Sequence, residues 1–170
     1  MEETFQQYTA RMLSLAEGLD PHSILATTPG RIGALLAGHS TTDLQWSPSP
    51  GRWSIAQIVL HLADVEIVLA YRVRMILSAP GGPIQAFNQD AWVVSQHAER
   101  SDAHTSLALF STLRASMVRL FGTLTEEELD RYGMHAERGR ESIRHLIRMS
   151  TGHDRNHLSQ IERLLEERRQ

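Results

Sequence analysis

Apolar residues recur at steps of three and four along the last part of the chain, and this spacing predicts an amphipathic helix. Between residues 141 and 165 the inward positions carry Ile143, Leu146, Ile147, Ser150, His153, His157, Ile161, Leu164 and Leu165. Charged residues fall between them, as expected for the solvated side of such a helix, namely Arg144, Arg148, Arg155, Glu162, Arg163 and, after Leu165, Glu166. Two histidines, His153 and His157, therefore occupy positions where the pattern calls for core residues.

A second apolar stripe lies earlier in the chain. It consists of Ile55, Ile58, Val59, His61, Leu62, Val65, Val68, Leu69 and Val73. Ser54 and Gln57 form a capping-box pattern that opens this helix, and the proline and glycine residues of 79–83 predict its end near Ser78. A third histidine, His61, lies in the middle of the stripe.

The other segments also predict helices, and none predicts a strand. We expect a helix over residues 2–19 that ends at the Asp20-Pro21 break, and a shorter helix after Pro29. A further helical segment covers residues 88–121, with a new start at Asp102.

Shorter features complete the pattern. Residues 41–52 read as a loop, Thr125 with Glu128 opens a helix of one or two turns, and Gly139 precedes the last long helix. Together these elements predict an all-α fold, a four-helix bundle with short extra helices, as a single domain over residues 1–170.

Composition narrows the classes of function. The 170 residues are 41% hydrophobic and 22% charged, which is ordinary for a globular domain, and no stretch is long and apolar enough for a membrane span. The net charge of −3 and the absence of a basic block argue against a nucleic-acid partner. No secretory leader is evident, so we expect a cytoplasmic protein. The chain has no cysteine, so a metal would be held by imidazole, carboxylate or water.

The three inward histidines are the strongest chemical signal. His153 and His157 are four residues apart and project from one side of one helix. A single inward histidine is more often a hydrogen-bonded core residue than a ligand. Three inward imidazoles on helices that pack together would each bury a polar edge, and one divalent metal would satisfy all three.

Three short motifs, in this order and separation, resemble the DinB-like family. They are the stretch 50–57 (Pro-Gly-Arg-Trp-Ser-Ile-Ala-Gln) with His61-Leu-Ala-Asp64, the pair Asp90 and Trp92, and the stretch 153–161 with its H-x-x-x-H-x-x-Q-I pattern. The similarity spans nearly the whole chain and is greatest to the YfiT-type branch.

The resemblance implies a four-helix bundle that binds a divalent metal, often zinc or nickel, through His61, His153 and His157. It also implies a homodimer and a small-molecule substrate. Members of the family include thiol S-transferases that use bacillithiol or mycothiol, thiol-dependent isomerases, and proteins labelled metal-dependent hydrolases. Residues 81–87 and 138–141 carry no motif that names the substrate.

The three histidines by themselves, apart from the family resemblance, also indicate metal-dependent chemistry. Three imidazoles leave open positions on a metal, as in catalytic rather than structural sites. Such an ion activates either a water for hydrolysis or a substrate thiol for transfer, and the thiol would have to arrive with a cosubstrate. The alternative is a non-catalytic, metal-stabilised bundle that acts as a dimeric ligand-binding protein.

Other side chains are weaker candidates. Asp64 and Gln160 each follow a histidine by one turn and would orient its ring, although Asp64 fits a helix border equally well. Asp90 and Trp92 are pocket candidates, with core packing as the alternative for Trp92. We expect Asp154 to face solvent. No role is assigned to His97, His104, His135 and His145.

Overall fold

The structure, a computed structural model, describes residues 3–169. Its helices are α1 (Phe5–Leu15), α2 (Pro21–Leu36), α3 (Thr41–Gln45), α4 (Ile55–Ser78), α5 (Gln89–Ser95), α6 (Ala103–Phe121), α7 (Glu126–Asp130) and α8 (Ile143–Arg169), with a 3₁₀ turn at Ala98–Arg100. Its strands are β1 (Pro83–Ile84), β2 (Tyr132–His135) and β3 (Gly139–Ser142). No helix among residues 3–169 combines the length and hydropathy needed to cross a bilayer.

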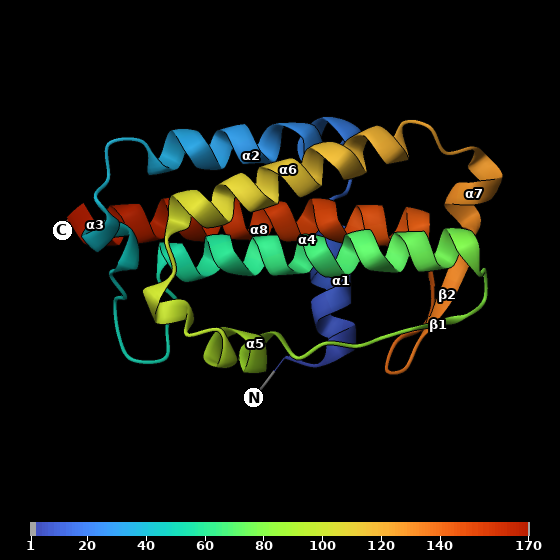
Figure 1. Ribbon diagram of the computed structural model, residues 1–170, viewed down its shortest axis with the longest axis horizontal. Helices are drawn as coiled ribbons and strands as arrows, with labels where there is room; N and C mark the ends of the chain where they lie inside the picture. The colour runs from blue at the N-terminus through green and yellow to red at the C-terminus, as the bar shows by residue number, and fades with distance from the viewer. Residues whose placement is uncertain (1–2, 170) are drawn as a thin grey trace.

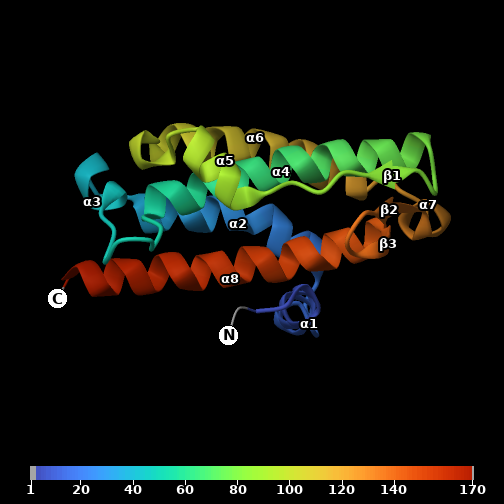
Figure 2. The same ribbon diagram turned by 90° about the horizontal axis from the view of Figure 1, so that it is seen from below.

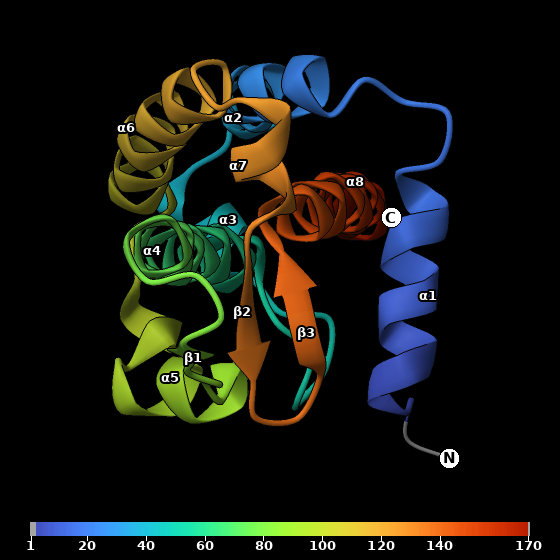
Figure 3. The ribbon, with the colours of Figure 1, turned by 90° about the vertical axis from the view of Figure 1, so that its right-hand side faces the viewer.

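Four long helices, α2, α4, α6 and α8, form a bundle (Figure 1). Neighbouring pairs pack around the ring in the order α4, α6, α2, α8 (Figure 3). The expected fold class, a predominantly helical four-helix bundle with short extra helices, is confirmed.

The bundle core consists of two apolar clusters with polar side chains between them. One cluster joins Ile58 and Leu62 of α4 to Phe110 and Leu158, and the other joins Leu69, Val73 and Ile76 to Met117, Phe121 and Leu146. The buried polar side chains between the clusters include Asp64 and Glu66 of α4, Arg114 of α6 and His153 of α8. Both apolar ends exclude water, so this middle layer is where buried polar groups must find partners in the protein.

Helix α2 is longer than the sequence suggested. We expected a short helix after Pro29, but α2 begins at Pro21 and runs through Pro29 to Leu36. A proline inside a helix leaves the carbonyl four residues earlier without its amide donor. Here that carbonyl belongs to Leu25, and Arg114 Nη1 donates to it at 3.3 Å. A side chain from α6 thus replaces the missing backbone hydrogen bond.

Helix α1 lies outside the bundle. The expected helix over residues 2–19 is shorter, Phe5–Leu15, and it crosses α8 at a steep angle (Figure 2); Glu2 lies outside the described residues. The two helices touch at Gly152, where a Cβ atom would come within 1.8 Å of the Met12 carbonyl oxygen. Glycine at position 152 therefore permits this close crossing, one residue before His153.

Several boundaries agree with the sequence and others do not. Helix α4 ends at Ser78, α6 is capped by Asp102 and α7 by Thr125, as expected. The predicted loop 41–52 instead begins with the short helix α3, capped by Ser40. Residues 88–121 form two helices, α5 and α6, which a 3₁₀ turn separates.

A small sheet is the feature that we did not expect. Strand β2 pairs in parallel with β1 and antiparallel with β3, so that Ile84 lies opposite His135 and His135 opposite Gly139. The strands have only two to four residues, too few to show an alternating pattern, and β1 pairs with a segment about 50 residues away. Figure 3 shows the sheet beside α4 and α8, between α5 and α1.

Candidate metal centre and adjoining cavity

Three buried histidines from two helices converge in the middle layer of the bundle. His61 lies on α4, and His153 and His157 lie one turn apart on α8. The His61 and His153 Nε2 atoms are 3.0 Å apart, and the His157 and His153 Nε2 atoms are 3.1 Å apart. Each side chain is at most 7% exposed. The packing of α4 on α8 therefore brings three nitrogen donors to one point.

This donor set fits one divalent ion. Two nitrogens bound to the same ion at 2.0–2.1 Å lie about 2.9–3.4 Å apart for angles between 90° and tetrahedral, a range that contains both separations. Hydrogen bonding alone does not account for the cluster. A ring nitrogen offers one hydrogen or one lone pair, so His153 Nε2 forms a good hydrogen bond with only one of its two neighbours. A shared cation would satisfy all three nitrogens.

The histidines are held in the neutral form that metal binding requires. Burial lowers the pKa of His61 to about 3, with a further contribution from His157. Burial also lowers the pKa of His157 to about 4 and that of His153 well below its usual value. At neutral pH each imidazole therefore carries one hydrogen and one lone pair.

Gln160 determines which nitrogen of His157 carries the hydrogen. Gln160 Oε1 lies 2.9 Å from His157 Nδ1, and because an amide oxygen only accepts, Nδ1 must donate. The lone pair of the neutral ring is then on Nε2, which points at the other histidines. This is the orienting contact that we expected of Gln160 from its position one turn after His157.

Asp64 has a different partner from the one that its spacing suggested. Its carboxylate Oδ2 accepts a hydrogen bond from Gln96 Nε2 at 3.1 Å, and burial raises the pKa of Asp64. No hydrogen bond between Asp64 and His61 is present among the described residues. Besides the other two histidines, the ring of Trp53 lies beside His61, with a distance of 5.0 Å between the ring centroids. Trp53 belongs to the motif quoted for the family resemblance, but its position in a loop gave no indication of this contact.

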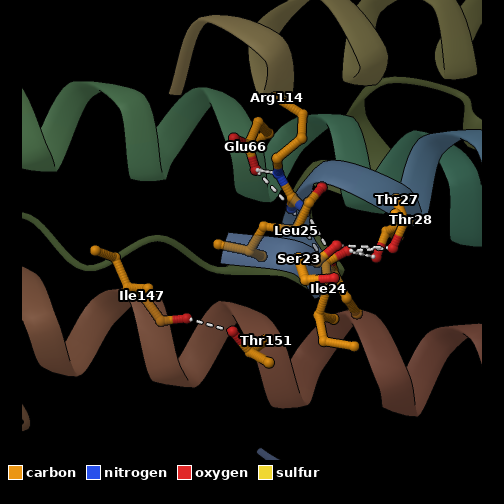
Figure 4. Close-up of polar contacts among 10 residues, drawn as sticks. Ser23, Ile24, Leu25, Thr27, Thr28, Glu66, Arg114, Ile147 and Thr151 are labelled. Carbon is orange, nitrogen blue, oxygen red and sulfur yellow. Dashed lines mark hydrogen bonds and ion pairs between the residues drawn. The ribbon is translucent and has the colours of Figure 1, made fainter. Parts of the chain in front are cut away.

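Asp154 is buried, and our expectation that it faces solvent is wrong. It is 1% exposed and forms an ion pair with Arg114 of α6, which also binds Glu66 of α4 with an Nη2–Oε2 distance of 2.8 Å. Figure 4 shows Arg114 reaching both Glu66 and the Leu25 carbonyl. The helical periodicity placed Asp154 on the solvent side, but Arg114 of α6 pairs with its carboxylate. This pairing offsets the cost of burying the charge.

One arginine thus links the four bundle helices beside the histidines. The sequence held a signal for it, since Arg114 falls between Phe110 and Met117 at inward spacing. Glu66 has one carboxylate oxygen, Oε1, that is buried without a hydrogen-bond partner among residues 3–169, and burial raises the pKa of Glu66.

A cavity of about 420 Å³ extends from His153 to the small sheet. One wall is a face of α4 with Val65, Val68, Leu69 and Arg72, and the opposite wall is a face of α8 with Leu146, Met149, Ser150 and His153. Phe5 and Tyr8 of α1 and Phe87 of the segment before α5 close the sides. His135, Arg138 and Glu141 of the β2–β3 hairpin form the far end.

The remaining pocket candidates do not line this cavity. Asp90 is exposed in the first turn of α5, and Trp92 is half-buried with its ring 5.1 Å from that of Phe87. The neighbouring residues Phe87 and Gln89 line the cavity instead. His135, to which the sequence assigned no role, is 3% exposed and lines it as well. Only the pairing of β2 brings His135 there, so the sequence offered no local signal.

Curated relatives are similar in sequence to this chain over most of its length. A "putative metal-dependent hydrolase" of Oceanobacillus iheyensis is 26% identical over 138 residues, which cover 81% of this chain and 79% of that protein. YfiT of Bacillus subtilis, which has the same description, is 22% identical over 142 residues, or 83% of this chain and 80% of that protein.

Solved structures show the same fold. The structure of Bacillus subtilis YfiT superposes with a TM-score of 0.79 at 20% identity, covering 98% of this chain and 90% of that one. A DinB-like protein of Bacillus subtilis, YjoA, matches more distantly, with a TM-score of 0.51 at 18% identity over 95% of this chain and 91% of that one. The sequence model of the DinB superfamily matches residues 24–161, a span that includes all three histidines. The chain belongs to the DinB superfamily.

Proposed function

We propose that this protein is a metal-dependent enzyme whose His61, His153 and His157 hold one divalent ion, zinc or nickel. The observation that carries the proposal is the convergence of three buried, neutral imidazoles, one of which, His153, also lines a cavity. The names of the curated relatives, which describe metal-dependent hydrolases, support the same reading.

The reaction that we propose first is transfer of a low-molecular-weight thiol, such as bacillithiol or mycothiol, to an electrophile; hydrolysis is the second. A bound divalent ion lowers the pKa of a thiol or a water that joins it. The protein contributes the ligand geometry, through Gln160 and the α4–α8 contact, and an apolar cavity that limits water around the reactants. The chain has no cysteine, so a thiol must come from the cosubstrate.

The metal is tested by elemental analysis of protein purified without a histidine tag. We expect one divalent ion per chain, lost in His157→Ala, while His97→Ala, which removes an exposed histidine, should keep it. Absence of metal from the unmodified protein, even after incubation with zinc or nickel, would contradict the proposal.

The reaction is tested by following conjugation of bacillithiol, mycothiol or cysteine with a chlorodinitrobenzene, and hydrolysis of ester and amide probes in parallel. Turnover that stops on chelation and returns when the metal is added back supports the proposal of a metal-dependent enzyme. The assay that shows turnover, conjugation or hydrolysis, identifies the reaction. Metal binding without turnover in any arm would favour the non-catalytic, ligand-binding bundle. Turnover that is indifferent to chelation would refute metal-dependent chemistry.

A further inference from the structure

The far end of the cavity contains a buried arginine without a counter-ion. Arg72 lies on α4, is 7% exposed, and lines the cavity that ends at His153. Its Nε and Nη2 atoms donate to the backbone carbonyl of Gln85, which is a neutral acceptor. Among residues 3–169 no carboxylate forms an ion pair with Arg72, and its Nη1 makes no hydrogen bond. The ring of Phe87, whose centroid lies 6.0 Å from the guanidinium carbon, is also a neutral partner. A buried charge with no opposite charge is costly, so the free protein lacks an anionic partner here.

The acidic residues nearby are already paired or exposed. Glu141 is held by Arg138, with a distance of 3.0 Å between Arg138 Nη2 and Glu141 Oε2, and Glu3 is held by Arg11. Glu137 is exposed on the hairpin. These pairs leave Arg72 as the uncompensated buried cation of the cavity. A divalent ion on three neutral imidazoles would make the cavity more positive still.

His135 adds a second unmatched donor beside Arg72. The Glu137 amide donates to His135 Nδ1 at 3.2 Å, while Arg72 Nη2 lies 3.3 Å from His135 Nε2. Burial lowers the pKa of His135, and a neutral imidazole accepts at only one nitrogen. Since the Glu137 amide and Arg72 Nη2 are both donors, one of them faces the ring nitrogen of His135 that carries the hydrogen. With Nδ1 as the acceptor, the Nε2 hydrogen of His135 has no acceptor, and the Arg72 Nη2 group that faces it finds none in His135.

We propose that Arg72, with His135, binds an anionic group of the substrate, a carboxylate or a phosphate, at the end of the cavity opposite His153. A guanidinium that presents free N–H groups fits the oxygens of such an acid. An oxygen placed between Arg72 and His135 would accept from both.

The cavity also defines the rest of the substrate. Val65, Val68, Leu69 and Arg72 of α4 line the cavity, and Arg72 lies eleven residues, or about 16 Å along the axis, from His61 on the same helix. The wall between them is apolar. A substrate that reaches both ends therefore has its acidic group separated from the reacting atom by a hydrophobic spacer. This part of the inference rests on the proposed function, because it takes the histidines as the reactive end.

Binding of a probe acid tests the proposal without an assay of activity. Octanoate and octyl phosphate carry the proposed group on an apolar chain, and octanamide is the neutral match for octanoate. We expect titration calorimetry to show at least one acid binding about 10- to 100-fold more tightly than octanamide. Whichever of octanoate and octyl phosphate binds more tightly shows whether the site prefers a carboxylate or a phosphate. Equal affinity of all three probes would overturn the proposal.

Two arginines on the same helix provide matched variants. Arg72→Gln should abolish the preference for the acid over octanamide, and Arg74→Gln, which alters an exposed arginine two residues away, should leave it unchanged. If circular dichroism shows that Arg72→Gln is unfolded, Arg72→Lys retains the charge without the planar fork and should reduce the preference. A full preference in the folded variant would refute the role of Arg72.

His157→Ala separates this inference from the metal proposal. An acid that binds at Arg72 should keep its preference in His157→Ala, whether or not the protein binds metal. An acid that loses its affinity in His157→Ala but keeps it in Arg72→Gln binds at the histidines, and the inference then fails while the metal proposal stands.

Discussion

His157 illustrates how a single side chain is prepared for a metal. Its Nδ1 donates to Gln160, its Nε2 faces the other two histidines, and burial keeps its ring neutral. Each of these contacts removes one alternative orientation or protonation state. The ring therefore needs no rearrangement before it binds an ion.

Replacing Gln160 tests this preparation. Gln160→Leu removes the acceptor for Nδ1, so the ring loses its fixed tautomer, and metal affinity should fall about 10- to 100-fold. Gln160→Glu keeps an acceptor and should retain the affinity. The measurement is competition with a chromophoric chelator. Unchanged affinity in Gln160→Leu would show that the hydrogen bond does not support the site.

The buried histidines also predict a pH dependence for the metal-free protein. The pKa of His61 is about 3 and that of His157 about 4 in the folded state, below the ordinary value of 6.5. Between pH 6.5 and 4 the unfolded chain therefore binds protons that the folded chain does not. The contribution of these neutral imidazoles to the free energy of unfolding is therefore fully present above pH 6.5. Below pH 6.5 the free energy of unfolding falls by about 1.4 kcal/mol per pH unit for each such imidazole.

Urea unfolding of the chelated protein at pH 7, 6 and 5 measures this slope. His157→Leu removes one of the titrating rings, so its stability should depend less steeply on pH than that of the unmodified chain. Parallel slopes for the two proteins would mean that His157 protonates freely in the folded state.

At the scale of elements, two contacts position the helices that carry the site. Gly152 lets α1 approach α8 beside His153, and Arg114 joins α6 to α4, α8 and the α2 carbonyl of Leu25. Both contacts involve residues of α8 that flank His153, Gly152 on one side and Asp154 on the other. The site therefore depends on how these helices cross as well as on the ligands themselves.

Gly152→Ala should disturb the first contact. The added Cβ would lie 1.8 Å from the Met12 carbonyl oxygen, so α1 must shift, and we expect a loss of about 1–3 kcal/mol of unfolding free energy. Gly33→Ala in α2 is the matched control, because its Cβ would meet only Leu107 of α6, at 3.7 Å. Chemical unfolding of both variants should show destabilisation for Gly152→Ala alone.

Arg114→Met should disturb the second contact. It leaves the carboxylates of Glu66 and Asp154 without their cation and the Leu25 carbonyl without its donor, at a cost of about 3–5 kcal/mol. Arg119→Met, at an exposed position of the same helix, should change stability by less than about 0.5 kcal/mol. Equal stability of the two variants would show that the buried ion pairs contribute nothing.

At the scale of the whole molecule, a metal would link two helices of the bundle that are far apart in the sequence. The ligands come from α4 and α8, which are about 90 residues apart in the chain. The unfolded chain does not hold this arrangement, so an ion that binds it selects the folded state.

Chelation should therefore lower the thermal midpoint of the protein. At a free metal concentration 100 times the dissociation constant the ion adds about 2.7 kcal/mol, which corresponds to about 5–10 °C for a chain of this length. Scanning calorimetry with and without chelator measures the shift, and His157→Ala should show none. A midpoint unaffected by metal in the unmodified protein would contradict a site formed only on folding.

The differences between expectation and structure arise at long-range contacts. The periodicity correctly placed His61, His153 and His157 inward, because each repeats at the spacing of a local helical face. It misplaced Asp154, whose burial depends on Arg114 of another helix. It also began the second helix wrongly after Pro29, although the same arginine replaces the hydrogen bond that Pro29 cannot make and the helix begins at Pro21. It also missed His135, which reaches the cavity through pairing of β2 with β1.

The sequence by itself determined the helical class, the inward direction of the three histidines and the family, since these follow from spacing along one helix and from the order of short motifs. The tertiary structure decided that α2 rather than α1 completes the bundle, that Arg114 gathers Glu66 and Asp154, and that Arg72 and His135 meet at the end of the cavity. The physical reason is that periodicity reports which face of a helix is buried, whereas the partner of a buried charge is set by the neighbouring elements that packing brings to that face.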